Sequence, residues 1–269
     1  MSETPNRGLF PALLKYWRRQ RGMSQLDLSL AAEVSARHIS FLETGRAAPS
    51  AEMILRLGAA LNMPMREQNA MLSAAGFERA FAEPDAAEGV GAEVERVLSM
   101  MLAQHEPYPM VVMNRTYDLL RSNQGAQRLV STFVADPTAL TPPLNVLHLL
   151  FDPRLTRPFI RNWTQVARML VARLHREALA APYDAELNDL LEGLFDYPEV
   201  PPGWRQPDFA VPMTAALTVE LVRDELQLNL LTTLTVFSVP HNATIEDLRV
   251  ESYFPTDDAT VAAFQRWQR

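Results

Sequence analysis

The side chains between Gln25 and Arg46 suit the recognition of a polynucleotide better than the transformation of a substrate. A guanidinium fork matches the O6 and N7 atoms of guanine, and amide and hydroxyl groups bond well to phosphate oxygens. We therefore expect Arg37 to read a guanine, and Gln25 and Arg46 to bind phosphates. Phe41 could touch a thymine methyl group or pack within its own domain. The complete set of expected DNA contacts is Gln25, Ser35, Ala36, Arg37, His38, Ser40, Phe41 and Arg46.

Residue types that perform covalent or metal chemistry form no recognisable constellation. The chain has no cysteine, and none of its five histidines has a cysteine or glutamate at a zinc-binding spacing. Sequences typical of a nucleophile elbow, a phosphate-binding loop or a dinucleotide site are also missing. His175 stands among Arg173, Arg176 and Glu177, which predicts a solvated helix face. These observations argue against an enzyme, a metal site or a catalytic cofactor.

Helical periodicity places the expected contacts on two short helices joined by a tight turn, within residues 23–50. Ser24 and Ser35 can cap the two helices, and Gly45 supplies the left-handed backbone that ends the second. Further helices are predicted at 9–21, 51–62 and 64–76. The residues expected between or inside the two motif helices are Leu26, Ser29, Leu30, Ala32, Val34, Ile39 and Leu42.

This segment resembles the helix-turn-helix of the XRE, or lambda-repressor-like, family. The resemblance implies an all-α domain of five helices whose second motif helix enters the major groove of DNA. Glu33 departs from the family, which usually has glycine in the turn, and a non-glycine residue there costs on the order of 1 kcal/mol of backbone strain. The alternative is a helical hairpin that binds no DNA. The matching residues are Ser24-Gln25, Ala32, Val34-Ser35, Ile39, Leu42-Glu43 and Gly45-Arg46.

Charge is unevenly distributed along the 269 residues, whose net charge is −7. Residues 1–77 carry nine basic and six acidic side chains, whereas residues 78–269 carry 16 basic and 26 acidic ones. A basic N-terminal face suits DNA, and the acidic remainder argues against a second nucleic-acid site. The span 78–93, rich in Glu, Ala, Pro and Gly, is expected to be a linker between domains at 1–77 and 94–269.

Arginines crowd the end of the first predicted helix, at positions 18, 19 and 21. They could bind phosphates, or they could complement the helix dipole alone. The N-terminus lacks the apolar core of a signal peptide, and no apolar run approaches the roughly 20 residues of a membrane helix. We therefore expect a cytoplasmic protein without membrane insertion.

The second domain is expected to combine helices with an antiparallel sheet. Asp224 and Glu225 should turn a hairpin between two long strands. The expected strands are 110–113, 118–121, 211–221, 226–239 and 248–254, and the expected helices are 94–104, 123–133, 145–151, 155–180, 185–195 and 257–267. One hairpin face is predicted to carry Thr214, Leu217, Val219, Leu221, Leu228, Leu230, Thr232, Leu234 and Val236. This order resembles an α+β, PAS-like fold, which implies a pocket between sheet and helices.

Several motifs along the chain resemble the MmyB-like branch of the XRE family. The resemblance implies a transcription regulator whose C-terminal domain binds a small ligand, with a fatty acid or related lipid as effector. Tyr117 and Ser122 stand where that branch tends to have tryptophan, which allows a different pocket shape or another small apolar ligand. The motifs are Arg37-His38, Ser40 to Ala47, Pro49-Ser50, Asn114-Arg115, Phe151 to Arg154, Asn162-Trp163 and Asp247 to Pro255.

A lipid site needs an apolar lining and a polar anchor for the head group. Methionine adapts to a flexible chain, arginine can pair with a carboxylate, and tyrosine or tryptophan can donate a hydrogen bond. The alternative is that these methionines are ordinary core and these arginines are solvated or salt-bridged. The expected ligand contacts are Met110, Met113, Arg115, Tyr117, Arg157, Arg161 and Trp163, with Met100, Met101, Met169 and Met213 as further candidates.

The combined prediction is a regulator that binds a near-palindromic site on double-stranded DNA as a homodimer. One such domain makes too few contacts for a specific operator at physiological salt. A lipid-like effector in the second domain would bias DNA affinity if it binds the two states unequally. The alternative is a C-terminal domain that serves dimerisation or protein docking and holds no small molecule.

Overall fold

The computed structural model describes residues 9–81, 91–181, 184–212, 216–237, 245 and 247–267. These residues form two compact units, one with helices α1 to α5 and the other with the remaining helices and all the strands. The first change between the units along the chain falls after residue 90, inside the span expected to be a linker, and residues 238–246 are again assigned to the first unit. No helix among the described residues is both long and apolar enough to cross a membrane.

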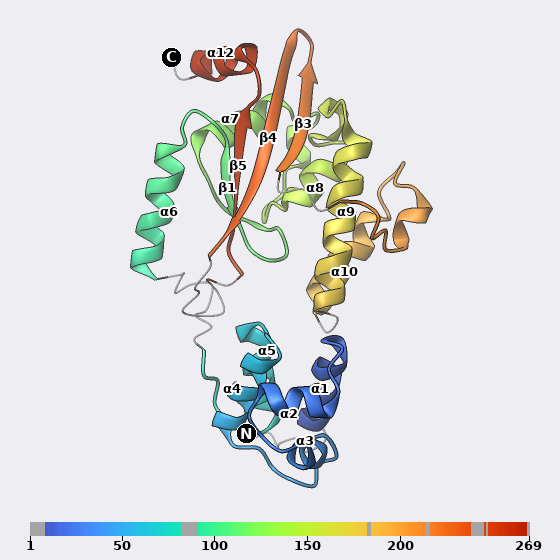
Figure 1. Ribbon diagram of the computed structural model, residues 1–269. Helices are drawn as coiled ribbons and strands as arrows, with labels where there is room; N and C mark the ends of the chain where they lie inside the picture. The colour runs from blue at the N-terminus through green and yellow to red at the C-terminus, as the bar shows by residue number, and fades with distance from the viewer. Residues whose placement is uncertain are drawn as a thin grey trace. The chain divides into compact units, whose positions relative to one another are not determined.

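Five helices build the N-terminal unit (Figure 1), in agreement with the predicted all-α domain. Every helix contributes fully buried apolar side chains to one core, among them Leu14, Leu28, Ile39, Leu57 and Leu72. Each such burial stabilises the fold by about 1.5–3 kcal/mol. The helices are α1 (Leu9–Gln20), α2 (Gln25–Ala31), α3 (Ala36–Glu43), α4 (Ala51–Ala60) and α5 (Met65–Ala74).

The predicted inward stripe of α2 is wrong. Leu26 and Leu30 are 59% and 71% exposed, whereas Leu28 is fully buried. Positions 26 and 30 share one face of this short helix, and position 28 lies on another. Because all three residues are leucine, apolar character alone does not predict which face is buried. Ser29 and Ala32 are buried as expected, which lets α2 and α3 cross closely.

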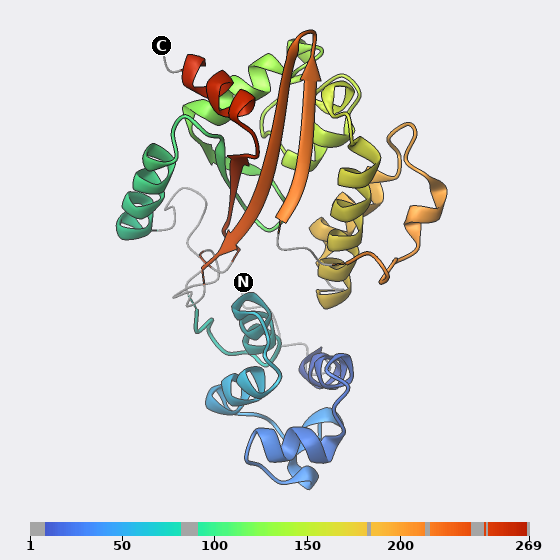
Figure 2. The same cartoon turned by 45° about the horizontal axis from the view of Figure 1, so that its top comes forward.

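The second unit is an α+β domain around a five-stranded antiparallel sheet with the order β2-β1-β5-β4-β3. The strands are β1 (Met110–Met113), β2 (Leu119–Ser122), β3 (Ala216–Arg223), β4 (Leu226–Val236) and β5 (Arg249–Pro255). The helices are α6 (Ala92–Gln104), α7 (Gln124–Thr132), α8 (Val146–Phe151), α9 (Trp163–Ala180), α10 (Ala185–Leu194) and α12 (Asp258–Trp267), with short 3-10 turns at Pro137–Ala139, Arg157–Phe159 and Pro202–Arg205. Figure 2 shows α9 beside the edge strand β3, with α10 next to α9.

The β3–β4 hairpin agrees with the prediction. Arg223 pairs with Leu226, so Asp224 and Glu225 form a two-residue turn, and Asp224 takes the positive φ of 53° that such turns require. The predicted face is buried at Leu217, Val219, Leu221, Leu228, Leu230 and Thr232, but Val236 at the strand end is 57% exposed. Thr214 lies outside the described residues.

The long helix predicted from residue 155 begins instead at Trp163. Before it, the backbone N–H of Arg161 donates to Glu220 O at 2.8 Å, and the Asn162 side chain donates to Thr218 O at 2.9 Å. The segment thus pairs with the edge of β3. Pro158, which helical backbone tolerates only in its first turn, lies in the 3-10 turn that precedes this pairing.

Candidate DNA interface and ligand cavity

A buried ion pair fixes the helix-turn-helix to α1. The Arg18 guanidinium donates to both carboxylate oxygens of Glu43 at 2.5 and 2.9 Å, and to Met23 O at 2.7 Å. The Gln25 amide donates to the same carboxylate at 2.9 Å. Burial raises the pKa of Glu43, but the hydrogen bonds from Arg18 and Gln25 and the positive charge of Arg18 outweigh burial and hold that pKa below its usual 4.5.

Local signals set the two motif helices as the sequence predicts. The Ser24 hydroxyl accepts from Asp27 N at 3.1 Å while Ser24 N donates to the Asp27 carboxylate at 2.8 Å, a complete capping box. The Ser35 hydroxyl accepts from His38 N at 3.1 Å and caps α3. Glu33, in the turn, has a φ of 54°, and Gly45, past α3, has a φ of 70°.

The exposed side of α3 carries most of the expected DNA contacts. Arg37 is exposed, and its guanidinium carbon lies 5.1 Å from the centre of the Phe41 ring, one helical turn further on. Phe41 is half-buried, and its ring supports the Arg37 guanidinium. Arg46 is exposed just past the helix, where its N–H donates to Phe41 O at 2.8 Å. Ala36, His38 and Ser40 are half-buried along the same helix.

Two of the three arginines at the end of α1 bond to other residues of the N-terminal unit. Arg18 forms the ion pair with Glu43, and Arg21 donates to Leu61 O and Asn62 O at 2.7 Å each, which satisfies carbonyls at the end of α4. Arg19 is exposed and is the one suited to a phosphate. Gln25 was expected to bind a phosphate, but its amide is already held by Glu43, so any phosphate contact would be shared with that bond.

A cavity of about 290 Å³ lies between the sheet and helices α7, α8 and α9. Its volume is close to the lower end of the range for ligand pockets. The walls are mostly leucine and valine, with polar side chains at a few points. The apolar lining includes Val111, Leu119, Leu129, Val146, Leu147, Leu170, Leu217, Val219 and Leu221, and the polar lining includes Tyr117, Gln127, Arg173, Glu251 and Tyr253.

Of the expected ligand contacts, Tyr117 alone lines this cavity. Met110 and Met113 are buried in strand β1 but do not line it, and Met113 belongs to the main core. Met100 is 53% exposed on α6, and Met213 lies outside the described residues. The lining is made of branched aliphatic side chains instead, because strand register and helix faces, not side-chain flexibility, decide which residues point inward.

Two of the expected anchors form a structural clamp. The Arg157 guanidinium donates to Phe151 O at 3.3 Å, to Pro198 O at 2.6 Å and to the Glu199 carboxylate at 2.7 Å. It lies 3.9 Å from the centre of the Trp163 ring, whose Nε1 donates to Leu150 O at 2.9 Å. Both polar groups are therefore occupied by the protein itself, and the prediction that they hold a ligand is not supported.

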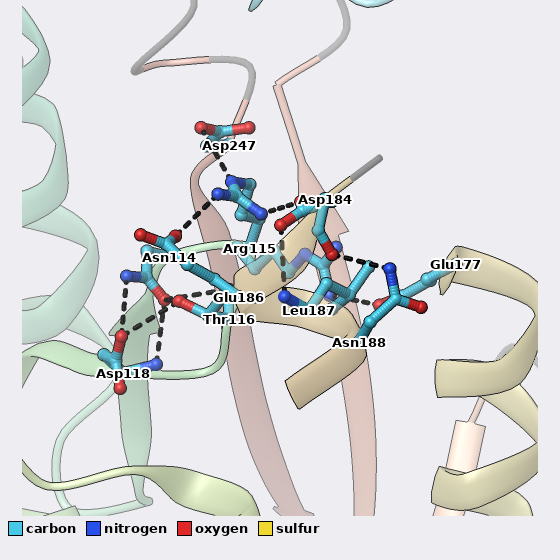
Figure 3. A network of polar contacts seen from close by, with 11 residues as sticks. Asn114, Arg115, Thr116, Asp118, Glu177, Asp184, Glu186, Leu187, Asn188 and Asp247 are labelled. Carbon is cyan, nitrogen blue, oxygen red and sulfur yellow. Dashed lines mark hydrogen bonds and ion pairs between the residues drawn. The ribbon is translucent and has the colours of Figure 1, made fainter. Parts of the chain in front are cut away.

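Neither of the other two arginines lines the cavity. Arg161 is exposed and donates to the Gln227 side chain at 3.3 Å. Figure 3 shows Arg115 surrounded by the carboxylates of Asp184, Glu186 and Asp247. Arg115 thus joins the β1–β2 turn to the start of α10 and to the residues before β5. Among its partners, Asp184 also caps α10 by accepting from Leu187 N at 3.1 Å.

Tyr117 occupies a strained position beside the cavity. Its φ is 64°, which non-glycine residues seldom adopt, and its side chain is 2% exposed. The hydroxyl donates to the Glu177 carboxylate at 3.2 Å, and Arg249 both bonds Glu177 at 2.9 Å and lies 4.9 Å from the Tyr117 ring centre. Burial, together with the Glu177 charge, raises the pKa of Tyr117, so the hydroxyl stays protonated as a donor.

The polar lining on α9 and β5 was not predicted from the sequence. Arg173 and His175 were expected on a solvated face, but Arg173 lines the cavity and His175 is 6% exposed, with its Nε2 at 2.8 Å from Trp204 O. Glu251 and Tyr253 line the cavity from β5. The available signal was a charged residue, Glu251, in the middle of the predicted strand at 248–254.

No group of three or more potential metal-ligating side chains gathers in the parts of the chain that the structure describes.

Comparison with known proteins agrees with this architecture. Residues 14–68 match a helix-turn-helix family, and residues 94–266 match the MmyB-like transcription regulator ligand binding domain. No curated protein matches the chain. Among solved structures, an RNA-binding light-oxygen-voltage receptor aligns with 14% identity and a TM-score of 0.29, over 96% of this chain and 58% of that one. That score is too low to indicate a shared fold. The match over residues 94–266 shows that the chain belongs to the MmyB-like transcription regulators, with a helix-turn-helix domain ahead of the ligand-binding domain.

Proposed function

We propose that the protein regulates transcription by binding double-stranded DNA through α3, with Arg37 reading a guanine in the major groove. The exposure of Arg37 over Phe41 supports this, because a supported guanidinium loses less freedom when it meets a base. Arg46 and Arg19 contact phosphates of the DNA backbone that flank the major groove. Ser35 and Gln25 add further contacts to the DNA phosphates. Ala36, His38 and Ser40 lie close to the base edges.

The DNA-bound form is a homodimer on a near-palindromic operator. A single five-helix domain offers few base-reading side chains, and two copies bring the number of contacts to what a specific site needs. Half-sites would be spaced about 34 Å apart, one helical turn, so that both copies of α3 face the same side of the duplex.

The second domain senses a small apolar molecule, with a fatty acid or related lipid as the leading class. The cavity of about 290 Å³, walled by leucine and valine, is the observation that carries this proposal. The alternative, a docking module that holds no small molecule, would be supported by a solid core in this domain, and the cavity favours the sensor.

Selection of operators from random duplexes, followed by mass determination of the complex, tests the DNA part. We expect a symmetric motif and two protomers per duplex, and one protomer on an asymmetric site would contradict the dimer. Mass spectrometry of an organic extract of the full-length protein tests the sensor. We expect a bound lipid whose addition to stripped protein changes operator affinity, and an empty extract with no lipid effect on affinity would favour the docking module.

A further inference from the structure

One cationic side chain of the cavity wall has no bonding partner. Arg173 on α9 makes no hydrogen bond or ion pair with any residue in the described part of the chain, although it is half-buried. Its electrostatic neighbours are Tyr117 and Glu251. A guanidinium with five N–H donors in an apolar wall is costly unless something accepts those donors.

A buried carboxyl group lines the same cavity from the sheet side. Glu251 is 9% exposed and pairs in register with Val111 of β1, another lining residue. Burial raises the pKa of Glu251, while Arg173 and the hydroxyls of Thr232 and Tyr253 act in the opposite direction without cancelling that rise. The cavity therefore has one polar region with a donor group, Arg173, and a carboxyl that can hold or release a proton.

The surroundings of Glu251 contain few other charges. Arg173 on α9 acts on Glu251 through its charge, and the neutral phenol of Tyr253 on β5 hydrogen-bonds to it, whereas Glu177 and Arg249 interact with Tyr117. The turn after β1 contributes Tyr117, β4 contributes the uncharged Thr232, and β1 contributes Val111. Glu177 and Arg249 are already bonded to each other at 2.9 Å. Arg173 and Glu251 are thus the two charged side chains among the described residues that line the cavity.

We propose that Arg173 and Glu251 form the head-group site of the cavity, and that this site takes an amphiphile whose head accepts from Arg173 and shares one proton with Glu251. The chemical class is a carboxylic acid, with the primary carboxamide as its neutral equivalent. This inference rests on the proposed small-molecule site and assigns its polar contacts.

Proton balance follows from the two carboxyl groups. An ionised ligand carboxylate beside an ionised Glu251 would place two like charges together, as in a carboxylate dyad, so one proton is taken up from solvent and shared between them. Arg173 then neutralises the remaining negative charge. A carboxamide brings its own N–H to Glu251 and an oxygen to Arg173, and it binds without proton uptake.

Calorimetric titration of the full-length, lipid-stripped protein with decanoic acid, decanamide and methyl decanoate tests the assignment. Titrations in buffers of different ionisation enthalpy report the protons taken up. At pH values above the titration of Glu251 in the empty cavity, the acid should bind with uptake of about one proton, and its affinity should fall about tenfold per pH unit. The amide should bind with an affinity independent of pH, and the ester, which has no donor, should bind more weakly than the amide.

Glu251→Gln should abolish proton uptake and remove the pH dependence of acid binding. The glutamine amide has its own N–H to donate to the ligand carboxylate, so no proton has to be taken up from solvent. Glu220→Gln is the matched control, because Glu220 lies on β3 between the lining residues Val219 and Leu221 and does not line the cavity. Arg173→Met should weaken the binding of decanoic acid at least tenfold.

Acid binding that takes up no proton in the alkaline range, or that is unchanged by Glu251→Gln, would overturn the assignment while leaving the ligand site intact. Failure of all three compounds to bind would overturn the assignment together with the sensor. The wild-type proton count needs no variant, so a variant that does not fold leaves the test complete.

Discussion

Arg18 and Glu43 are joined by two hydrogen bonds of 2.5 and 2.9 Å, although they come from the end of α1 and the end of α3. The Glu43 side chain is 2% exposed and that of Arg18 is 11% exposed. The bond holds α3 against the body of the domain, and Gln25 ties α2 to the same carboxylate. The orientation of α3, the helix that we propose reads DNA, therefore depends on the buried Arg18–Glu43 pair.

Replacing Arg18 by methionine should destabilise the N-terminal unit by about 3–5 kcal/mol, because the Glu43 carboxylate would stay buried without its partner. Hydrogen–deuterium exchange of α1 and α3 would show the loss as faster exchange. Arg56→Ala is the control, since Arg56 and Glu52 form an exposed pair at 2.9 Å and such pairs contribute at most about 1 kcal/mol. Equal effects of the two variants would contradict the role of the buried pair.

The same carboxylate makes the N-terminal unit sensitive to acid. The folded-state pKa of Glu43 lies below its usual 4.5, so the stability it contributes is full above pH 4.5 and is lost as the pH falls through the folded value. Glu43→Gln should lower the unfolding temperature of this unit at pH 7 and flatten its decline below pH 4.5, as measured by calorimetry. Asp27 also has a lowered pKa, from hydrogen bonds with Ser24, so Asp27→Asn controls for the capping box. A decline as steep in Glu43→Gln as in the wild type would contradict this account.

Substitution of Arg37 by alanine should weaken operator binding by about 1–3 kcal/mol and relax the preference at one base pair. Binding to a panel of operators with single base changes, measured at fixed salt, separates specificity from affinity. Arg46→Ala is the comparison. Loss of a phosphate contact should weaken binding to all operator sequences alike and reduce the salt dependence of binding, the slope of log K against log salt concentration, by about one. Uniform weakening by Arg37→Ala would make Arg37 a phosphate contact instead.

The helix-turn-helix could be predicted from the sequence because its signals are local. Ser24, Ser35 and Gly45 each act within a few residues of their own position, and all three behave as expected. The predicted buried face of α2 was wrong at Leu26 and Leu30, because the face that is buried depends on where α1 and α3 pack.

The cavity was less accessible to sequence reasoning. Arg173 and Glu251 belong to α9 and β5, and they line one cavity because α9 packs against the sheet in which β5 pairs with β1 and β4. No spacing in the sequence encodes that proximity. Methionine flexibility and arginine charge do not predict which side chains line the cavity, because strand register and competing carboxylates, as at Arg115, decide where those side chains lie.

Adjacent residues of β1 allow the cavity to be filled selectively. Val111 lines the cavity, whereas Val112 is 1% exposed and does not line it. Val111→Phe should place its ring in the empty volume and reduce uptake of decanamide at least tenfold, with little loss of stability. Val112→Phe has no such space, so it should cost about 1–3 kcal/mol of stability through overpacking.

Titration with decanamide and thermal unfolding of both variants measure these effects. If uptake were reduced equally by both substitutions, general disruption of the sheet would explain the loss and the cavity would not be the binding site. If Val111→Phe bound decanamide as well as the wild type, the ligand would have to lie elsewhere in the molecule. Selective loss in Val111→Phe, with operator binding of the ligand-free protein retained, would locate the effector between the sheet and α7, α8 and α9, because Val111 reaches that space and Val112 does not.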